Sequence, residues 1–391
     1  MTRYIVLRDT AGAWRRPEIP LEAKCARIAP DALAAPVIDA HDFTPAELRE
    51  AARAPNFLVV SPVIPTRIIG PEPLDELRAD DGVAGWGIDA VGARPHGAGG
   101  AGAALALLDT GIDAGHPAFA GLRIEPRDFA GSGIEDANGH GTHLAGTALG
   151  RDVAGERIGV APGVDRLVVG KAVSDTGRGD SQGFLQAMLF ALARRVDVIG
   201  FALAFDIGRL VEDLVEADYP ISLANAAAIH AYRGNLRIFE TLLQMQDRPP
   251  LILGAVGNDC RRTISPEFET GPSSPAAARN VLSVGALAPG PQGLCPAPFS
   301  NCGPELVAPG VDVRSAEPGG GLRSMHSSSA AMAHALGVAG LWVAALRATG
   351  QPTDARHVAA RLLASATRDG LAGAPSVIDV GQGLVQAPPV A

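Results

Sequence analysis

Lysine is nearly absent from this chain of 391 residues, which contains only Lys24 and Lys171 and takes almost all of its positive charge from arginine. With 33 Lys and Arg residues against 42 Asp and Glu residues, the formal net charge is −9. The sequence therefore lacks the basic surface that a nucleic-acid-binding protein needs. We attribute the arginine bias to the composition of the genome.

Cysteine is also scarce, with four residues in the chain: Cys25, Cys260, Cys295 and Cys302. Four are too few for a disulfide framework in a chain of this length, and no CxxC pair indicates a zinc site. Free thiols are therefore expected, although Cys295 and Cys302 are near enough in sequence to approach each other in a loop.

Long apolar runs are missing as well. No run reaches the length of about 18 residues that a membrane span needs, and the N-terminal sequence MTRYIVLRD becomes charged too early for a signal peptide. We therefore expect a cytoplasmic protein with no membrane partner. Hydrophobic residues make up 47% of the chain and charged residues 19%, a balance that supplies a core and excludes a mostly disordered chain.

Residues 1–78 predict a small α+β domain. Residues 4–7 and 57–60 are short β-prone runs, and residues 43–54 have the pattern of a helix with Thr44 as its N-cap. Closely spaced prolines and a glycine-rich stretch follow, so we place the domain boundary at residue 78.

From residue 79 to residue 391, short continuous apolar runs alternate with segments of helical spacing. This alternation is typical of a parallel sheet that is covered on both faces. We predict an α/β fold with three layers, αβα, and a mostly parallel central sheet. The runs are residues 104–108, 166–173, 196–203, 251–256 and 281–286, and a helix with one buried face is expected at residues 184–195.

Four polar residues stand at predicted strand ends or helix starts of this domain: Asp109, His140, Asn258 and Ser329. Taken one at a time, Asp109 is explained as a strand-end carboxylate, Asn258 as an Asx-turn residue and Ser329 as a helix cap. Together they supply an orienting carboxylate, a base, an oxyanion donor and a nucleophile, which are the groups that acyl transfer needs.

Two other motifs suggest different chemistry, and we predict neither. Residues 97–102 match the GxGxxG pattern of a dinucleotide site, but they precede a predicted strand instead of following one. His140 and His143 are three residues apart, a spacing that suits a metal on a helix, but no glutamate lies between them and no third ligand is evident. No metal site is assigned.

The segments around the four residues resemble the subtilisin-like serine peptidases, or subtilases. The resemblance covers most of residues 80–391, and the order Asp, His, Ser is the order known for subtilisin. It rests on residues 86–93, 107–117, 139–146, 158–163, 197–203, 255–258 and 299–311.

The resemblance implies a subtilisin-like fold and a serine endopeptidase that needs no cofactor for its chemistry. Asp109 would orient His140, and His140 would take the proton from Ser329, which attacks the peptide carbonyl. The amide of Asn258 and the backbone N–H of Ser329 would hold the oxyanion. Calcium is frequent in this family, but no run of Asp and Asn ligands identifies a structural calcium site.

The resemblance also implies a binding site for a peptide or protein substrate in extended form. Residues 177–181 are expected to form an edge strand that pairs with the substrate backbone. The residue before the cut is expected between two short wall segments. The expected substrate-binding residues are Gly177, Arg178, Gly179, Ala202, Leu203, Ala204, Ala255, Val256 and Gly257.

The serine motif departs from the family pattern. Where subtilases usually read Gly-Thr-Ser-Met-Ala-x-Pro-His, this chain reads Ser327-Ser-Ser-Ala-Ala-Met-Ala-His334, and the five-residue step to His334 identifies Ser329 as the nucleophile. If the missing glycine needs a left-handed backbone, Ser327 adds strain. We favour an active peptidase of narrow specificity, since all four catalytic side chains are kept. The alternative is a non-catalytic pseudoprotease that binds peptides as a regulatory module.

Two further regions have open roles. The N-terminal domain resembles the inhibitor-like propeptides of subtilases, which would cover the cleft and be removed by autocleavage near residues 70–85; a permanently attached regulatory or docking domain is the alternative. Residues 205–250 form an enlarged insertion, with one or two helices expected at residues 221–244. These helices would serve as a lid, as a partner surface, or as an insertion with no role.

Overall fold

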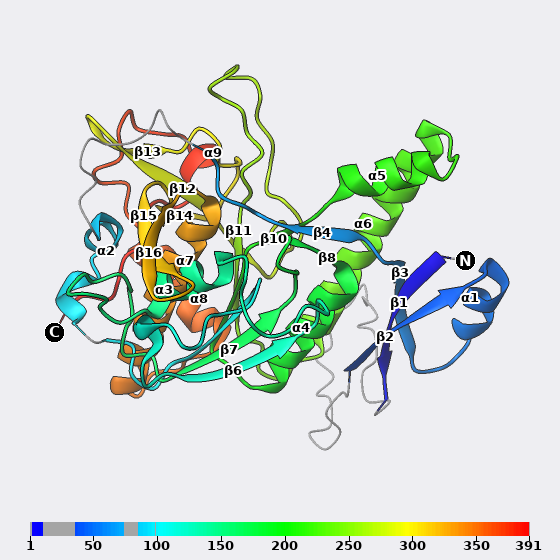
Figure 1. Cartoon of the computed structure of the whole chain (residues 1–391), viewed down its shortest axis with the longest axis horizontal. Helices are drawn as coiled ribbons and strands as arrows, with labels where there is room; N and C mark the ends of the chain where they lie inside the picture. The colour runs from blue at the N-terminus through cyan, green and yellow to red at the C-terminus, as the bar shows by residue number, and fades with distance from the viewer. Residues whose placement is uncertain (1, 11–35, 74–84, 98, 391) are drawn as a thin grey trace, which may run out of the picture. The chain divides into compact units, whose positions relative to one another are not determined.

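A computed structural model describes residues 2–10, 36–73, 85–97 and 99–390 of the chain (Figure 1). These residues form two compact units, which are described separately below. Unit 1 comprises residues 1–65 and 206–249, and unit 2 comprises residues 66–205 and 250–391. The boundary predicted at residue 78 falls outside the described residues.

The sheet of unit 1 has three antiparallel strands. Strand β1 (Thr2–Asp9) lies between β2 (Pro36–Phe43) and β3 (Phe57–Pro62). Both predicted strands are present and extend further than expected. Strand β2 was not predicted, because its sequence PVIDAHDF mixes polar and apolar residues without a regular alternation.

Helix α1 (Pro45–Ala51) begins where the sequence predicted. The hydroxyl of Thr44 accepts a hydrogen bond from the backbone N–H of Glu47, and the Glu47 carboxylate accepts one from the N–H of Thr44 at 2.8 Å. This reciprocal pair is a capping box, which satisfies two of the backbone donors at the helix start. The helix is shorter than expected, since Phe43 belongs to β2.

The insertion contributes two helices to unit 1. Helix α6 (Ile221–Gln244) is a single helix of 24 residues with the bounds that the sequence predicted, whereas α5 (Ile207–Glu216) was not predicted. Within this unit α6 packs against both α5 and β3. The insertion and the N-terminal sheet therefore share one structural unit.

The contact between α6 and β3 depends on a small residue and a buried amide. A Cβ atom on Gly234 would lie 2.4 Å from the Ser61 hydroxyl, so only glycine fits there. Next to it, the buried Asn235 donates from Nδ2 to the Ser61 hydroxyl at 2.9 Å and to the Pro62 carbonyl at 2.8 Å. These bonds satisfy polar groups that would otherwise be buried without partners.

Unit 2 is built on an eight-stranded sheet in which every pairing is parallel except that of β12 with β13. All five predicted apolar runs contribute to it, and the run at 196–203 divides into β9 and the start of β10. In spatial order the strands are β13 (Gly293–Pro296), β12 (Leu282–Gly290), β11 (Leu251–Ala255), β9 (Val198–Phe201), β5 (Ala104–Asp109), β7 (Arg166–Lys171) and β6 (Arg123–Asp128), with β14 (Leu306–Pro309) beside β12.

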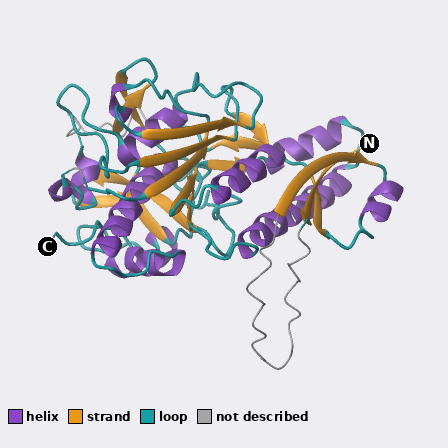
Figure 2. Cartoon of the chain, turned by 90° about the horizontal axis from the view of Figure 1, so that it is seen from below, coloured by secondary structure: helices purple, strands orange, loops and turns teal. Residues whose placement is uncertain are grey.

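Helices cover both faces of this sheet, as Figure 2 shows with strands in orange and helices in purple. On one face α7 (Ser328–Ala348) packs against α3 (His140–Leu149) and the central strands. On the other face α4 (Ser181–Ala193) presents Phe184, whose ring lies 5.4 Å from that of Phe201 in β9. Burial on both faces explains the continuous apolar runs and confirms the three-layer αβα fold.

Helix α7 is apolar enough, by length and composition, to cross a membrane, which the sequence analysis did not anticipate. However, 89% of its most apolar window is buried. Among the described residues it is the one helix that passes this test, and its packing is that of a core helix.

We predict that Gly234→Ala weakens unit 1. The added methyl group would collide with Ser61, and relief of such a clash costs about 1–3 kcal/mol. The matched control is Gly208→Ala in α5, where only Asp206 approaches the new atom, at 3.9 Å, and where alanine should be neutral or stabilising. Hydrogen exchange of the β3 and α6 amides measures both. Unchanged exchange in Gly234→Ala would show that this contact is loose.

Candidate active site

The carboxyl end of β5 and the start of α3 bring Asp109 and His140 together. Asp109 is the last residue of β5, and its Oδ1 lies 2.7 Å from Nδ1 of His140, the first residue of α3. Both side chains are fully buried. The pair thus has the geometry in which a carboxylate fixes the tautomer of an imidazole and leaves its Nε2 free to accept a proton.

The two histidines of α3 have opposite electrostatic surroundings. Burial by itself lowers the pKa of His140, but the charge and hydrogen bond of Asp109 outweigh this effect and raise the pKa above its ordinary value. His143 has no such carboxylate, and burial lowers its pKa to about 3. Its Nε2 contacts the Val313 carbonyl at 2.9 Å, which argues against a metal held by the histidine pair.

A second buried carboxylate, Asp136, holds the start of α3 in place. One of its oxygens accepts hydrogen bonds from the Thr110 hydroxyl and the Gly139 N–H, each at 2.8 Å. The other accepts from the N–H and the hydroxyl of Thr142 at 2.8 and 2.7 Å. Asp136 therefore links the residue after Asp109 to both sides of His140, and the sequence analysis missed it.

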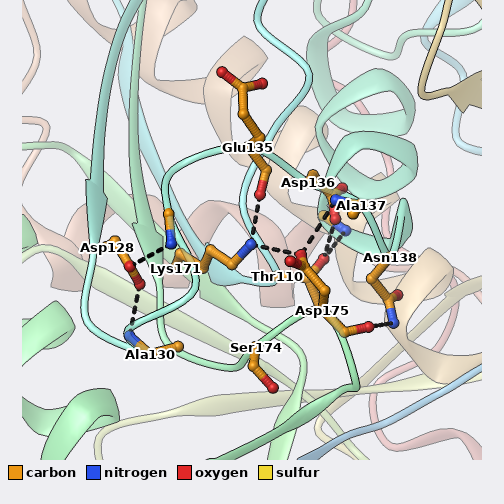
Figure 3. A network of polar contacts seen from close by, with 12 residues as sticks. Thr110, Asp128, Ala130, Glu135, Asp136, Ala137, Asn138, Lys171, Ser174 and Asp175 are labelled. Carbon is orange, nitrogen blue, oxygen red and sulfur yellow. Dashed lines mark hydrogen bonds and ion pairs between the residues drawn. The ribbon is translucent and has the colours of Figure 1, made fainter.

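Lys171 anchors the loop that carries Asp136 (Figure 3). It ends β7, pairs directly with Asp109 in the parallel register, and is 1% exposed. Its ammonium group bonds the Glu135 carbonyl and lies 2.6 Å from the carboxylate of Asp175, which also accepts from the Ala137 N–H at 3.2 Å. One of the two lysines in the chain is thus a buried structural cation beside the candidate site.

The serine triplet forms the start of α7 without backbone strain. Ser327 is the N-cap, with an extended φ of −167°, and its hydroxyl accepts from the Ala330 N–H at 3.0 Å. The strain that we expected from the missing glycine is therefore absent. Ser329 lies in the first turn, where unpaired N–H groups and the helix dipole favour negative charge.

Asn258 lies just after β11 and connects this helix start to a peptide segment. Its Oδ1 accepts from the Ser328 N–H at 2.9 Å, and its Nδ2 donates to the Gly70 carbonyl at 2.8 Å. The Ser329 hydroxyl donates to the Ile69 carbonyl at 2.6 Å. Two adjacent carbonyls of one segment thus accept hydrogen bonds from the two side chains that we expect to be the nucleophile and the oxyanion donor.

That segment, residues 66–72, runs through unit 2 as an extended chain. Strand β4 (Pro65–Ile68) is the central strand of a small sheet, between β10 (Leu203–Phe205) and β8 (Arg178–Asp180). The N–H of Ile68 donates to the Gly177 carbonyl, and that of Ile69 to the Ala202 carbonyl, each at 2.9 Å. The chain's own backbone therefore fills the place that the sequence analysis assigned to a substrate.

The expected substrate-binding residues fall into three groups. Gly177 precedes the edge strand β8, and Arg178 and Gly179 lie within it. The strand is shorter than the expected residues 177–181, because Ser181 already begins α4. The Ala202 carbonyl accepts from the Ile69 N–H at 2.9 Å, and Leu203 and Ala204 pair in register with Ile68 and Arg67. The remaining three are Ala255, Val256 and Gly257; all are buried, and of these Gly257 is tied to the helix start through the Ser328 hydroxyl at 3.1 Å.

Two atoms of the candidate site lack partners among the described residues. Nε2 of His140 is buried without a hydrogen bond, and so is Oδ2 of Asp109. The Ser329 hydroxyl bonds the Ile69 carbonyl, and its bond to His140 is not formed. The binding of residues 66–72 at Ser329 and Asn258 was not predicted from the sequence, because this segment contains the proline and glycine that are typical of a linker.

One cluster outside this site has metal-ligand residue types: Glu269, Cys302 and Asp379. The guanidinium of Arg262 already lies among them, 2.7 Å from Glu269 and 2.8 Å from the Cys302 sulfur. Burial raises the pKa of the Cys302 thiol to about 11. A cluster that contains a fixed cation and a protonated thiol does not fit a metal ion. The three described cysteines, Cys260, Cys295 and Cys302, are free.

We predict that Asp136→Asn, tested in a Ser329→Ala background, lowers the free energy of unfolding by about 1–3 kcal/mol. Each carboxylate oxygen of Asp136 faces a backbone N–H, so either orientation of the new amide opposes its NH₂ group to a donor. Urea denaturation followed by tryptophan fluorescence measures this effect. Asp369→Asn, on the exposed surface, is the matched control and should stay within about 0.5 kcal/mol. Equal free energies of unfolding with and without Asp136→Asn would show that Asp136 does not stabilise the start of α3.

The chain is similar in sequence to known proteins. A family model described as "Subtilase family" matches residues 100–382. The chain is 30% identical over 250 residues to "Intracellular serine protease" of Paenibacillus polymyxa, a match that covers 62% of this chain and 67% of that protein. It is 29% identical over 286 residues to "Subtilisin-like protease 6" of Arthroderma gypseum, which covers 71% of this chain and 62% of the relative.

The version of this last protein from Trichophyton equinum is 30% identical over the same length, and again 62% of the relative is covered. The chain thus spans less than two thirds of the length of these fungal relatives. The family match covers more than half of the chain, includes β5, α3 and α7, and confirms the resemblance noted in the sequence. The chain therefore belongs to the subtilase family, whose members are serine peptidases.

Proposed function

We propose that this protein is a serine endopeptidase that hydrolyses peptide bonds through Ser329, His140 and Asp109. The observation that carries the proposal is the extended segment at Ser329: a peptide carbonyl, that of Ile69, accepts the hydrogen bond of the Ser329 hydroxyl at 2.6 Å. A polypeptide backbone can therefore reach the nucleophile in the extended form that backbone pairing to an edge strand requires.

The chemistry follows from the positions of the side chains. Neutral His140 donates from Nδ1 to Asp109 and accepts the Ser329 proton at Nε2, while the serine oxygen attacks the carbonyl carbon. The Asn258 amide and the Ser329 N–H, at the positive end of α7, stabilise the oxyanion. Protonated His140 then gives its proton to the leaving amine, and water hydrolyses the acyl-enzyme with His140 again as the base. The substrates are peptides or proteins, and no cofactor takes part.

We further propose that the chain processes itself at the bond between Ile69 and Gly70. Ile69 supplies the carbonyl at Ser329, and Gly70 becomes the new N-terminus after cleavage. This step requires the Asn258 amide, which here donates to the Gly70 carbonyl, to transfer to the Ile69 oxygen. The following bond, Gly70–Pro71, is an imide, whose ring leaves no N–H to pair with a neighbouring strand. In this proposal residues 1–69 act as a propeptide, and the cytoplasm is the site of action, as the name of the Paenibacillus relative suggests.

One observation favours the alternative of a regulatory peptide-binding module. The Ser329 hydroxyl donates to Ile69 and not to His140, whose Nε2 has no partner among the described residues. A segment that stays uncut in this position would block the site permanently. A pseudoprotease and a peptidase share the fold, so the reactivity of Ser329 discriminates between them.

We predict that the purified full chain is cut between Ile69 and Gly70 and that the processed protein forms one covalent adduct with a fluorophosphonate when residues 66–69 leave the site. The activated hydroxyl is the nucleophile of both reactions, so Ser329→Ala should show neither cleavage nor adduct. Intact mass spectrometry measures both. His140→Ala should reduce both rates by several orders of magnitude, because the base is removed. If the wild-type chain stays intact, an added protease can be used to remove the segment from the site. Absence of labelling after that treatment would identify the protein as a pseudoprotease.

We also predict the pH dependence of labelling. His140 must be neutral to accept the serine proton, and Asp109 raises its pKa above the ordinary value of 6.5. Labelling should therefore be lost as the pH falls through a midpoint above 6.5 and be complete at higher pH. Asp109→Asn removes the negative charge, so both the midpoint and the maximal rate should fall. His143, with a pKa of about 3, does not titrate in this range. A midpoint unaffected by Asp109→Asn would contradict the assignment.

A further inference from the structure

The peptide segment at the candidate site makes two ion pairs through its side chains, and the closer one precedes the proposed cut, whereas the other joins Glu72 to Arg261 at 3.8 Å after it. A guanidinium nitrogen of Arg67 lies 2.6 Å from Oδ1 of Asp259, the residue that follows Asn258. Both side chains are partly exposed, by 38% and 35%. The backbone of Arg67 pairs with that of Ala204, a contact that any residue could make. The ion pair is therefore a contact that selects among side chains.

Asp259 is held by hydrogen bonds that do not involve Arg67. Its Oδ2 accepts hydrogen bonds from the Asn301 amide and the Ser273 hydroxyl, each at 3.0 Å. Its own backbone N–H donates to the Asn301 Oδ1 at 2.7 Å. These bonds fix the carboxylate plane and leave Oδ1 for the guanidinium. A preorganised acceptor loses little entropy on binding, which distinguishes it from a flexible surface acid.

The surroundings of Asp259 also favour its ionised form. Burial by itself raises the pKa of Asp259, but the hydrogen bonds of Asn301 and Ser273 and the charge of Arg67 outweigh it and bring the pKa below its ordinary value. A carboxylate that stays ionised is a strong partner for a planar guanidinium, which forms short, charge-assisted hydrogen bonds.

The next residues of the segment are aliphatic and lie against closed surfaces. Ile69 is 1% exposed. The side chain of Ile68 lies over Gly177, where a Cβ atom would be only 3.0 Å from its Cδ1 and Cγ1 atoms, and where the φ of +74° favours glycine. The segment thus presents one basic residue followed by two buried or packed aliphatic residues, each with its own place in unit 2.

We propose that Asp259 is a specificity-determining residue, which selects peptides with arginine at the position of Arg67, two residues before the carbonyl held at Ser329. The substrate class is an extended peptide with arginine followed by two aliphatic residues. This inference rests on the proposed peptidase function, and it deepens that function by assigning a basic-residue subsite to Asp259, Asn301 and Ser273.

The test uses the full chain with its own segment as the tethered ligand. Ser329→Ala prevents self-cleavage, and hydrogen exchange of the Ile68 and Ile69 amides reports how often the segment leaves the site. In this background Arg67 is replaced by Lys, Gln and Glu, and each replacement is repeated with Asp259→Asn. Arg356→Gln, the same chemical change on the exposed start of α8 (Ala355–Ser365), is the matched control.

With Asp259 intact, we expect exchange to be slowest with arginine, faster with lysine, about fivefold faster with glutamine, and faster still with glutamate. With Asp259→Asn, the arginine and glutamine chains should exchange at the same rate. Equal exchange of Arg67 and Arg67→Gln, or a difference that persists in Asp259→Asn, would overturn the proposal. The Arg67 series leaves Asp259 and its two partners intact, so it tests the subsite even if Asp259→Asn does not fold.

Failure of this inference and failure of the proposed function give different results. The proposed peptidase function is measured on chains that keep Ser329, by self-cleavage and by fluorophosphonate labelling. A chain that is labelled but shows no dependence on Arg67 remains a peptidase and loses the arginine subsite. A chain that shows the predicted order but forms no adduct keeps the subsite and loses the catalytic function.

Discussion

The buried pair of Asp109 and His140 is the constraint on which the rest of unit 2 depends. A charge in a dry interior is stabilising only when its geometry is fixed and its remaining hydrogen-bonding atoms have partners. The chain meets this demand in part, with the backbone N–H of Thr110 on Oδ1 of Asp109 and with Asp136, which joins Thr110 to the start of α3, while Oδ2 of Asp109 and Nε2 of His140 have no partner among the described residues. Lys171 and Asp175 then fix the loop that carries Asp136. A sheet edge alone would place the two residues near each other, but this network sets their distance.

Much of unit 2 could be predicted from its sequence, because its signals are local. Continuous apolar runs identified the strands, and a polar residue at the end of a run or the start of a helix identified Asp109, His140, Asn258 and Ser329. The partners of these residues could not be predicted in the same way. Asp136 and Lys171 are separated by 35 positions in the sequence and become neighbours only when β7 pairs with β5. Residues 66–72 show no hydrophobic pattern that would predict a strand. Strand β4 pairs on both sides with strands that are distant in sequence, so its own residues need no amphipathic alternation.

The N-terminal sheet and the insertion are a single structural feature, although about 140 residues separate them in the chain. Gly234 and Asn235 of α6 match Ser61 and Pro62 of β3 by shape and by hydrogen bonding, and neither half would bury these groups without the other. Of the roles considered for the insertion, a partner surface agrees best with this packing, and the partner is the chain's own N-terminal domain.

This packing has a consequence for the proposed cleavage at Ile69–Gly70. Strand β3 lies before that bond, and α6 lies after it, so a single cut leaves the two halves of unit 1 on different polypeptides that are still bound to each other. Cutting removes the covalent tether and thereby lowers the effective concentration of the segment at Ser329, but the β3–α6 contact keeps the fragment associated. Activity would then depend on the rate at which the segment 66–69 leaves the site, to which the Arg67–Asp259 pair contributes, and not on the rate of cleavage alone. A peptidase built in this way remains restrained by its own N-terminal domain until a better-fitting substrate or dissociation of the fragment clears the nucleophile.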